Sequence, residues 1–121
     1  MYRKENIVMN KSYVFALRII KLYKYLTVEQ KEYILSKQVM RSGTAIGALI
    51  KEAEHGQSKA DFIHKMSIAL KEANETTYWL ELLRDGQYIT QSMFKSIYPD
   101  AEEIVKLLVK IVKTSKKTRI S

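Results

Sequence analysis

Apolar residues recur along this chain at alternating spacings of three and four, the rhythm of amphipathic helices, and they divide it into four segments. The clearest series runs unbroken from Phe62 to Leu83. We expect helices over about 10–26, 28–55, 58–85 and 91–114. Because the connections between them are only a few residues long, successive helices should be antiparallel neighbours. The pattern therefore predicts an all-α fold with a single domain over 1–121, an antiparallel up-down-up-down four-helix bundle.

Local signals set the expected ends of these helices. Thr27 and Gln30 form a capping-box pattern, which predicts the start of the second helix. Gly56 is expected to end that helix in a left-handed conformation. Pro99 lacks an amide N–H and predicts a kink or a break at this point of the fourth segment. Residues 115–121 are expected to form a flexible basic tail.

Two further features bear on helix ends and helix packing. Ser58, with Asp61 three residues later, predicts the N-terminal cap of the third helix. Gly43 and Gly47 lie one helical turn apart and would let another helix approach closely, although each lowers helix propensity by about 1 kcal/mol. For these glycines, a contact role and a tolerated weak spot both stay open.

The composition restricts the class of protein. The chain has 121 residues, 4 Gly, 1 Pro and no Cys. The lack of cysteine excludes disulfides, thiolate metal ligands and a cysteine nucleophile, and it fits a reducing compartment. No stretch approaches the roughly 20 uninterrupted apolar residues of a membrane span, and the N-terminal residues lack the apolar core of a signal peptide. We therefore expect a soluble cytoplasmic protein.

Positive charge is concentrated at the two ends of the chain. Residues 1–28 hold six basic side chains and one acid, and residues 104–121 hold six basic side chains and no acid, whereas 29–103 hold nine basic and twelve acidic ones. In the predicted bundle the first and last helices are neighbours, so the two ends would form one positive face that attracts polyanions. We therefore expect RNA or DNA to bind without sequence specificity. The candidate nucleic-acid-binding residues are Lys11, Arg18, Lys21, Lys24, Lys106, Lys110, Lys113 and Lys117.

Other interpretations of the charged ends stay open. Rows of lysine are often only the solvated face of a bundle. A basic face would also suit an acidic protein partner, which would make the chain a structural or protein-interaction module. Tyr13 and Tyr25 have rings that can stack on bases, although packing at the core or its rim is the simpler expectation. We expect no enzymatic activity and no cofactor, because the sequence shows no nucleophile with a base, no phosphate-binding Gly loop and no metal cluster.

Arg41, Glu72 and Glu75 are expected to form a polar cluster between the second and third helices. These positions lie on parallel second stripes of two antiparallel neighbours. A structural ion-pair network, inside the bundle or at a subunit contact, is the expected role, with catalysis as the alternative.

Two carboxylate–histidine pairs have the spacing seen in di-iron bundles, Glu52 with His55 and Asp61 with His64. In such bundles two other helices each supply a carboxylate, and the first predicted helix supplies none. Both pairs flank one loop at the end of the bundle, so we expect solvated side chains and no metal.

Trp79 lies off the main apolar stripe of the third helix, with Tyr78 and Leu82 beside it. Such a group covers an edge of the bundle or anchors a subunit interface, where tryptophan is enriched.

A longer block of sequence carries a family resemblance. Residues 38–83, QVMRSGTAIGALIKEAEHGQSKADFIHKMSIALKEANETTYWLELL, closely resemble the four-helix-bundle proteins encoded in intervening sequences of bacterial 23S ribosomal RNA genes, and residues 11–26, KSYVFALRIIKLYKYL, resemble the first helix of that family. Ala45 and Leu49 stand where the commonest form of the motif has Ser and Asn, which removes two polar groups. The matching polar and aromatic positions are Arg41, Glu52, Glu72, Glu75 and Trp79.

The resemblance implies an assembly as well as a fold. Proteins of that family, and the similar accessory proteins of diversity-generating retroelements, form ring-shaped homopentamers of antiparallel bundles. The retroelement proteins bind nucleic acid and a reverse transcriptase, whereas no activity is firmly assigned to the intervening-sequence proteins. The resemblance thus implies a homopentamer whose subunit interface includes the Trp79 edge.

Overall fold

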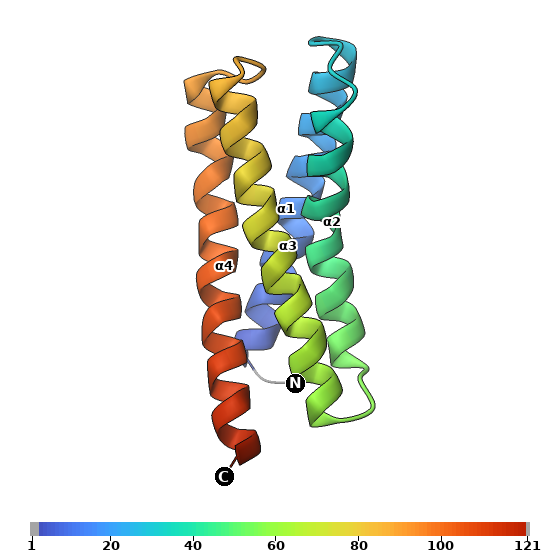
Figure 1. Ribbon diagram of the computed structural model, residues 1–121, viewed down its shortest axis with the longest axis vertical. Helices are drawn as coiled ribbons and strands as arrows, with labels where there is room; N and C mark the ends of the chain where they lie inside the picture. Colours follow the sequence, from blue (N-terminus) through green and yellow to red (C-terminus); the bar gives the residue numbers. More distant parts are fainter. Residues whose placement is uncertain (1–2, 121) are drawn as a thin grey trace.

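The computed structural model describes residues 3–120, and within that range it shows four helices and no strand. The helices are α1 (Arg3–Val28), α2 (Leu35–Glu54), α3 (Lys59–Asp85) and α4 (Gln91–Ile120). They run side by side, each antiparallel to the next (Figure 1). Because α1 and α3 each contact both α2 and α4, the four helices enclose one core. The predicted up-down-up-down four-helix bundle is confirmed.

A few predicted features fall outside the described part of the chain. The side chains of Arg3, Lys4, Glu5 and Arg119, which carry some of the end charges, are among them, and so is Ser121 of the predicted tail.

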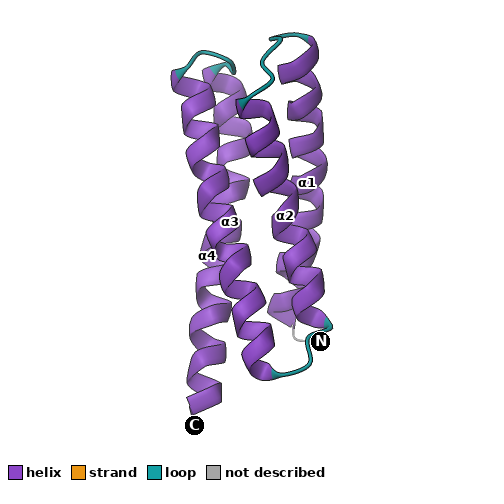
Figure 2. Cartoon of the chain, turned by 45° about the vertical axis from the view of Figure 1, so that its right-hand side comes forward, coloured by secondary structure: helices purple, strands orange, loops and turns teal. Residues whose placement is uncertain are grey.

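The core is built from the predicted apolar stripes. On α1, Phe15, Ile19 and Leu26 are at most 1% exposed. The α3 series is buried from Met66 to Leu83. Only short loops join the helices (Figure 2). Removing these stripes from water supplies the main favourable term in folding and fixes which helix faces remain for function.

The chain leaves α1 differently from the predicted capping box. The Thr27 hydroxyl donates to the Tyr23 carbonyl at 2.9 Å, so Thr27 belongs to the last turns of α1. Gln30 donates to the Tyr25 hydroxyl at 2.9 Å. Lys31 then takes a left-handed turn with φ 50°. The predicted capping box is wrong because both side chains hydrogen-bond to residues of α1, and α2 begins only at Leu35.

A carboxylate caps α2 instead. Glu32 is 9% exposed. A carboxylate at a helix start satisfies orphan amides and interacts favourably with the positive end of the helix dipole, which explains why α2 begins at Leu35 and not near residue 28. The Glu32 carboxylate oxygens accept hydrogen bonds of 2.7–3.1 Å from the backbone N–H groups of Ile34, Leu35 and Ser36.

This cap makes stability depend on acidity. Burial raises the pKa of Glu32, but the bonds from the three backbone N–H groups outweigh it, and the net pKa is lowered. A lowered folded-state pKa gives stabilisation that is present above the unfolded pKa and lost as the pH falls through the folded one. We expect Glu32→Ala to reduce the free energy of unfolding by about 1–2 kcal/mol at pH 7.

Urea denaturation at several pH values checks this prediction. The difference between wild type and Glu32→Ala should shrink as the pH falls below the unfolded-state pKa of glutamate. Glu29→Gln, an exposed neighbour, serves as the control and should change little. A Glu32→Ala deficit that is the same at every pH would show that the carboxylate charge is not what caps α2.

The turn between α2 and α3 confirms one predicted cap and corrects another. Ser58 Oγ accepts from the Asp61 N–H at 3.0 Å, as expected for the cap of α3. No glycine of the described residues has a positive φ, so the left-handed conformation predicted for Gly56 is wrong. The N–H groups of His55 and Gly56 close the last turn of α2 through 3.1 Å bonds to carbonyls three residues back. Such a tightened turn needs no left-handed residue.

Pro99 lies inside α4 and the helix is continuous there, so of the kink or break predicted at this point the break is wrong. Ile97 and Ala101 on either side are 6% and 0% exposed, so core packing holds the helix together across the proline. The Ser96 carbonyl, one turn earlier, also accepts from Arg18 Nη1 at 2.9 Å. This bond joins α1 to α4 in the turn before the proline.

Both terminal helices are longer than predicted. α1 begins at Arg3, before the predicted start near residue 10, and Val8 adds a fully buried position to the core. α4 continues to Ile120, through residues predicted to form a flexible tail from 115. Val112 and Ser115 are 7% and 9% exposed, so the last turns still have a buried side. No Gly or Pro interrupts either extension.

Gly43 lets α2 approach α1 closely, which favours the contact role over the weak-spot interpretation. A Cβ at this position would lie 2.8 Å from Cγ1 of Ile19, a β-branched side chain with no exposed surface. At Gly47 the nearest atom to an added Cβ would be Ser12 Oγ at 3.3 Å. The two glycines therefore differ in the space around them.

Alanine at the two glycines should have unequal effects. Overpacking costs about 1–3 kcal/mol, whereas alanine gains about 1 kcal/mol of helix propensity. We expect Gly43→Ala to be less stable than Gly47→Ala by about 1–2 kcal/mol in guanidinium denaturation, because Ile19 cannot move aside. Equal stabilisation by both substitutions would contradict the close α1–α2 contact.

Candidate nucleic-acid interface

α1 and α4 contact each other, as predicted, but two of their predicted nucleic-acid contacts are ion-paired across the seam. Lys11 Nζ is 3.1 Å from Glu103 Oε1. Arg18 Nη1 is 2.6 Å from Asp100 Oδ2, and its Nη2 donates to Ser96 Oγ at 2.6 Å. These surface ion pairs join α1 to α4 and offset the charge of Lys11 and Arg18, so neither side chain is a free cation, and their role in binding nucleic acid stays a prediction. The carboxylate partners, Asp100 and Glu103, lie on α4 just before the acid-free segment 104–121 and face α1.

The remaining six predicted cations are exposed and make no ion pair among the residues that the structure describes. They form two groups. We call Lys21 and Lys24 the α1 lysine pair. We call the other group, which recurs at 4-3-4 spacing on the second half of α4, the α4 lysine row; it consists of Lys106, Lys110, Lys113 and Lys117.

The two groups do not form the single face that the sequence predicted. The Arg18–Asp100 and Lys11–Glu103 contacts fix the register of the antiparallel helices, and they put Lys21 roughly level with residue 94. Lys106 is therefore about twelve residues, or roughly 18 Å, further along the bundle. The Debye length is about 8 Å at physiological salt, so the groups act as separate sites. The paired carboxylates lie between them.

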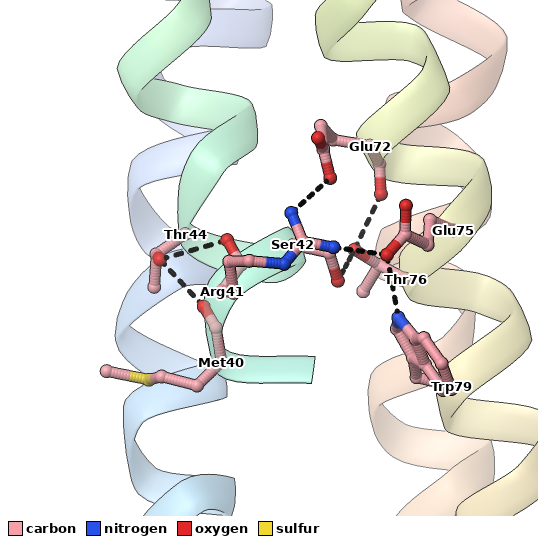
Figure 3. Close-up of polar contacts among 8 residues, drawn as sticks. All are labelled: Met40, Arg41, Ser42, Thr44, Glu72, Glu75, Thr76 and Trp79. Carbon is pink, nitrogen blue, oxygen red and sulfur yellow. Dashed lines mark hydrogen bonds and ion pairs between the residues drawn. The ribbon is translucent and has the colours of Figure 1, made fainter. Parts of the chain in front are cut away.

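The predicted cluster of Arg41 with Glu72 and Glu75 is present on the α2–α3 face (Figure 3). Arg41 Nη1 donates to Glu72 Oε1 at 3.1 Å, and Nη2 contacts Glu75 Oε1. Trp79 Nε1 donates to the same Glu75 oxygen at 3.1 Å. The Arg41 side chain is 51% exposed and the glutamates are 16% and 29% exposed. The cluster is thus a surface network, and losing it would cost less than losing a buried ion pair.

Beneath this network lies a small buried polar contact (Figure 3). The Ser42 and Thr76 hydroxyls share a hydrogen bond of 2.8 Å, and Thr76 also bonds to the Glu72 carbonyl at 2.8 Å. Both residues are fully buried. The contact ties α2 to α3 at the level of Arg41.

The aromatic edge predicted at Trp79 is partly open to solvent. Tyr78 is 53% exposed, and its ring meets that of Trp79 edge-on at 5.2 Å between centroids. Trp79 and Leu82 are half-buried. A surface of this kind has apolar area left for a further contact.

The two carboxylate–histidine pairs are not brought together as a ligand set. Glu52 is engaged by Lys65 Nζ at 3.0 Å, and this hydrogen bond raises the pKa of Lys65. His55 and His64 are exposed. Within the described range, no three His, Cys, Asp or Glu side chains gather in an arrangement that would hold a metal ion.

A contact that we did not predict joins α3 to α4. The Tyr98 hydroxyl donates to Glu81 Oε2, and this bond together with burial raises the pKa of Tyr98 to about 12. Arg84 lies 4.2 Å above the Phe94 ring, which stacks on Tyr98 at 4.5 Å. The i, i+4 spacing of the two aromatic residues was the available signal. These contacts attach α4 to α3, in addition to the ion pairs that join α4 to α1.

None of the described helices combines the length and the apolar character needed to cross a membrane.

The fold and these surfaces define an all-α four-helix-bundle protein. The family model of the 23S rRNA-intervening sequence protein matches residues 4–110. The chain therefore belongs to the 23S rRNA-intervening sequence protein family, as its motifs predicted.

A solved structure agrees with this assignment. The chain is similar to a protein of unknown function from the S23 ribosomal protein family of Bacteroides thetaiotaomicron VPI-5482, with 60% identity and a TM-score of 0.89. The match covers 91% of this chain and 98% of that one. No curated protein matches the chain.

Proposed function

We propose that the protein is a non-enzymatic, homo-oligomeric helical scaffold that binds RNA or DNA without sequence specificity through the α4 lysine row. The observation that carries the proposal is the row itself. Its four ammonium groups are exposed, lie on one helix and have no carboxylate partner among the described residues. Lysines in this state can release counterions from a phosphate backbone, which is the main source of non-specific affinity.

The dimensions of the row suit a nucleic-acid backbone. From Lys106 to Lys117 the helix rises about 16 Å. One strand of a DNA duplex rises about 3.4 Å per phosphate, so the row runs past about five phosphates. Lysine acts on them as a flexible point charge and does not read base edges, which supports binding without sequence preference.

An oligomer would multiply this modest site. We propose that the chain forms a ring, a pentamer by its family resemblance, with Tyr78, Trp79 and Leu82 at the subunit contact. Several rows on one ring would bind a long polyanion with avidity well above that of a single row. The proposal needs no cofactor, and it places the cysteine-free chain in the cytoplasm.

Binding measured across salt concentrations tests the function. Fluorescence anisotropy with single-stranded RNA and duplex DNA should give a log–log salt slope of about −2.8 and −3.6 respectively, for four phosphate contacts per chain. If the protein bound neither RNA nor DNA at 50 mM salt but did bind an acidic protein, the proposal would be contradicted and a protein-interaction module would be favoured.

The assembly has a test of its own. Light scattering should give a solution mass several times the 14.1 kDa of the chain. Replacing Tyr78 and Leu82 by Ser should lower that mass, whereas Tyr33→Ser, at a site 54% exposed in the α1–α2 loop, should not. A monomeric wild type would refute the oligomer and leave one α4 lysine row on each independent chain.

A further inference from the structure

Two open hollows lie next to each other at the end of the bundle away from the α4 lysine row, one between α1 and α4 and the other between the end of α1 and the α3–α4 loop. Their volumes are about 480 and 390 Å³. Tyr25 and Ile89 line both, so the hollows are adjacent. We call this double hollow the α1–α4 groove.

The lining of the groove combines three kinds of side chain. Leu22, Met93 and Ile97 give it apolar walls, and the rings of Tyr25 and Tyr88 lie along it. Both tyrosines are half-buried, so each keeps some accessible surface. The second hollow adds the side-chain amides of three glutamines, Gln30, Gln87 and Gln91.

The charge at the groove is positive. Its charged lining residues are Arg18, Lys21 and Arg84, and no described side chain that lines it is a carboxylate. Asp100 and Asp85 lie just outside and pair with the two arginines, which fixes the guanidinium planes in place. Lys21 is left as the exposed cation without an ion pair in the described chain, with Lys24 one turn further along α1.

We propose that the α1–α4 groove binds unpaired nucleotides of a single-stranded nucleic acid, with bases against Tyr25 and Tyr88 and the backbone along Lys21 and Lys24. This inference rests on the proposed function and adds a preference to it. In a duplex the bases are stacked inside and only phosphates would reach the lysines. Unpaired bases can splay out, stack on aromatic rings or guanidinium planes, and hydrogen-bond to amides.

The shape of the groove favours a polymer over a free nucleotide. Small-molecule sites bury about 70–90% of their ligand, which an open hollow does not do. A strand gains from many weak contacts in sequence, and the α1 lysine pair continues the path of its phosphates beyond the hollow.

Photocross-linking locates the bases directly. A 12-nucleotide RNA containing 5-iodouridine is irradiated with the full-length protein, which is then digested with trypsin and analysed by mass spectrometry. We expect cross-links on the peptides 25–31 and 85–95, which carry Tyr25 and Tyr88. Cross-links confined to other tyrosine peptides, such as the one with the exposed Tyr13, would overturn the inference.

A groove-filling variant tests the preference. Ser92 is an exposed residue on the lining, so Ser92→Trp should fill the groove without disturbing the core. We expect about tenfold weaker binding of single-stranded RNA, the scale of one lost base stack, and duplex affinity within about twofold. Gln38→Trp, at an exposed site on α2, is the matched control and should change neither.

The outcomes separate this inference from the proposed function. Equal affinity of wild type for single strand and duplex, with Ser92→Trp behaving as wild type, overturns the groove and leaves the α4 lysine row as the nucleic-acid site. Loss of all nucleic-acid binding in wild type overturns both. A selective effect of Ser92→Trp on single-stranded RNA supports the groove.

Discussion

Replacing Lys106, Lys110, Lys113 and Lys117 together by glutamine is expected to weaken nucleic-acid binding by roughly 10²–10³-fold at 0.15 M salt, because four counterion-releasing contacts are lost. The salt slope for duplex DNA should become less steep by about 3 to 4 units. The fold should persist, since all four side chains are exposed. Anisotropy titrations at several salt concentrations measure both quantities.

A second quadruple variant distinguishes the effect of where the positive charges lie from the effect of the total net charge. Lys37, Lys51, Lys59 and Lys71 are exposed on α2 and α3, and their replacement by glutamine removes the same charge from other faces. We expect at most a few-fold loss of affinity from the weaker overall field. Equal losses in the two quadruple variants would mean that net charge, and not the α4 lysine row, binds the polyanion.

Phe15→Ala is expected to lower the free energy of unfolding by about 3–5 kcal/mol. The ring is 1% exposed and belongs to the core stripe of α1, next to the seam with α4. Its removal takes a large apolar surface from the core and leaves a cavity that the packed helices fill only in part. Urea denaturation followed by helical circular dichroism gives the change.

An aromatic residue two positions away provides the control. Tyr13 is 67% exposed, so Tyr13→Ala should change stability by about 0.5 kcal/mol or less. Similar effects of the two substitutions would contradict the placement of the Phe15 ring in the core.

The helices and their buried faces could be predicted from the sequence because burial alone dictates a periodic pattern. Ile19, Val39, Leu80 and Ile104 all belong to predicted stripes and are at most 1% exposed. The ends of the helices were harder to predict because capping depends on which of several nearby acceptors reaches the free amides. At α2 this acceptor is Glu32, and the sequence favoured Thr27.

The candidate site was predictable only in part, for a related reason. Arg41 and its two glutamates follow from spacing, because residues on facing stripes of antiparallel helices must meet. The pairing of Arg18 with Asp100 depends on the axial register of α1 and α4, which are separated by most of the chain. A count of charges along the sequence contains no such register, so it overstated the number of free cations.

The measurement that tests the central claim most directly is lysine acetylation with and without bound single-stranded RNA, read residue by residue by mass spectrometry. At saturating RNA and low salt, Lys106, Lys110, Lys113 and Lys117 should be protected several-fold, while Lys37, Lys51, Lys59 and Lys71 should react as in the free protein. Unchanged reactivity along α4 in the saturated complex, or equal protection of both sets, would contradict the account.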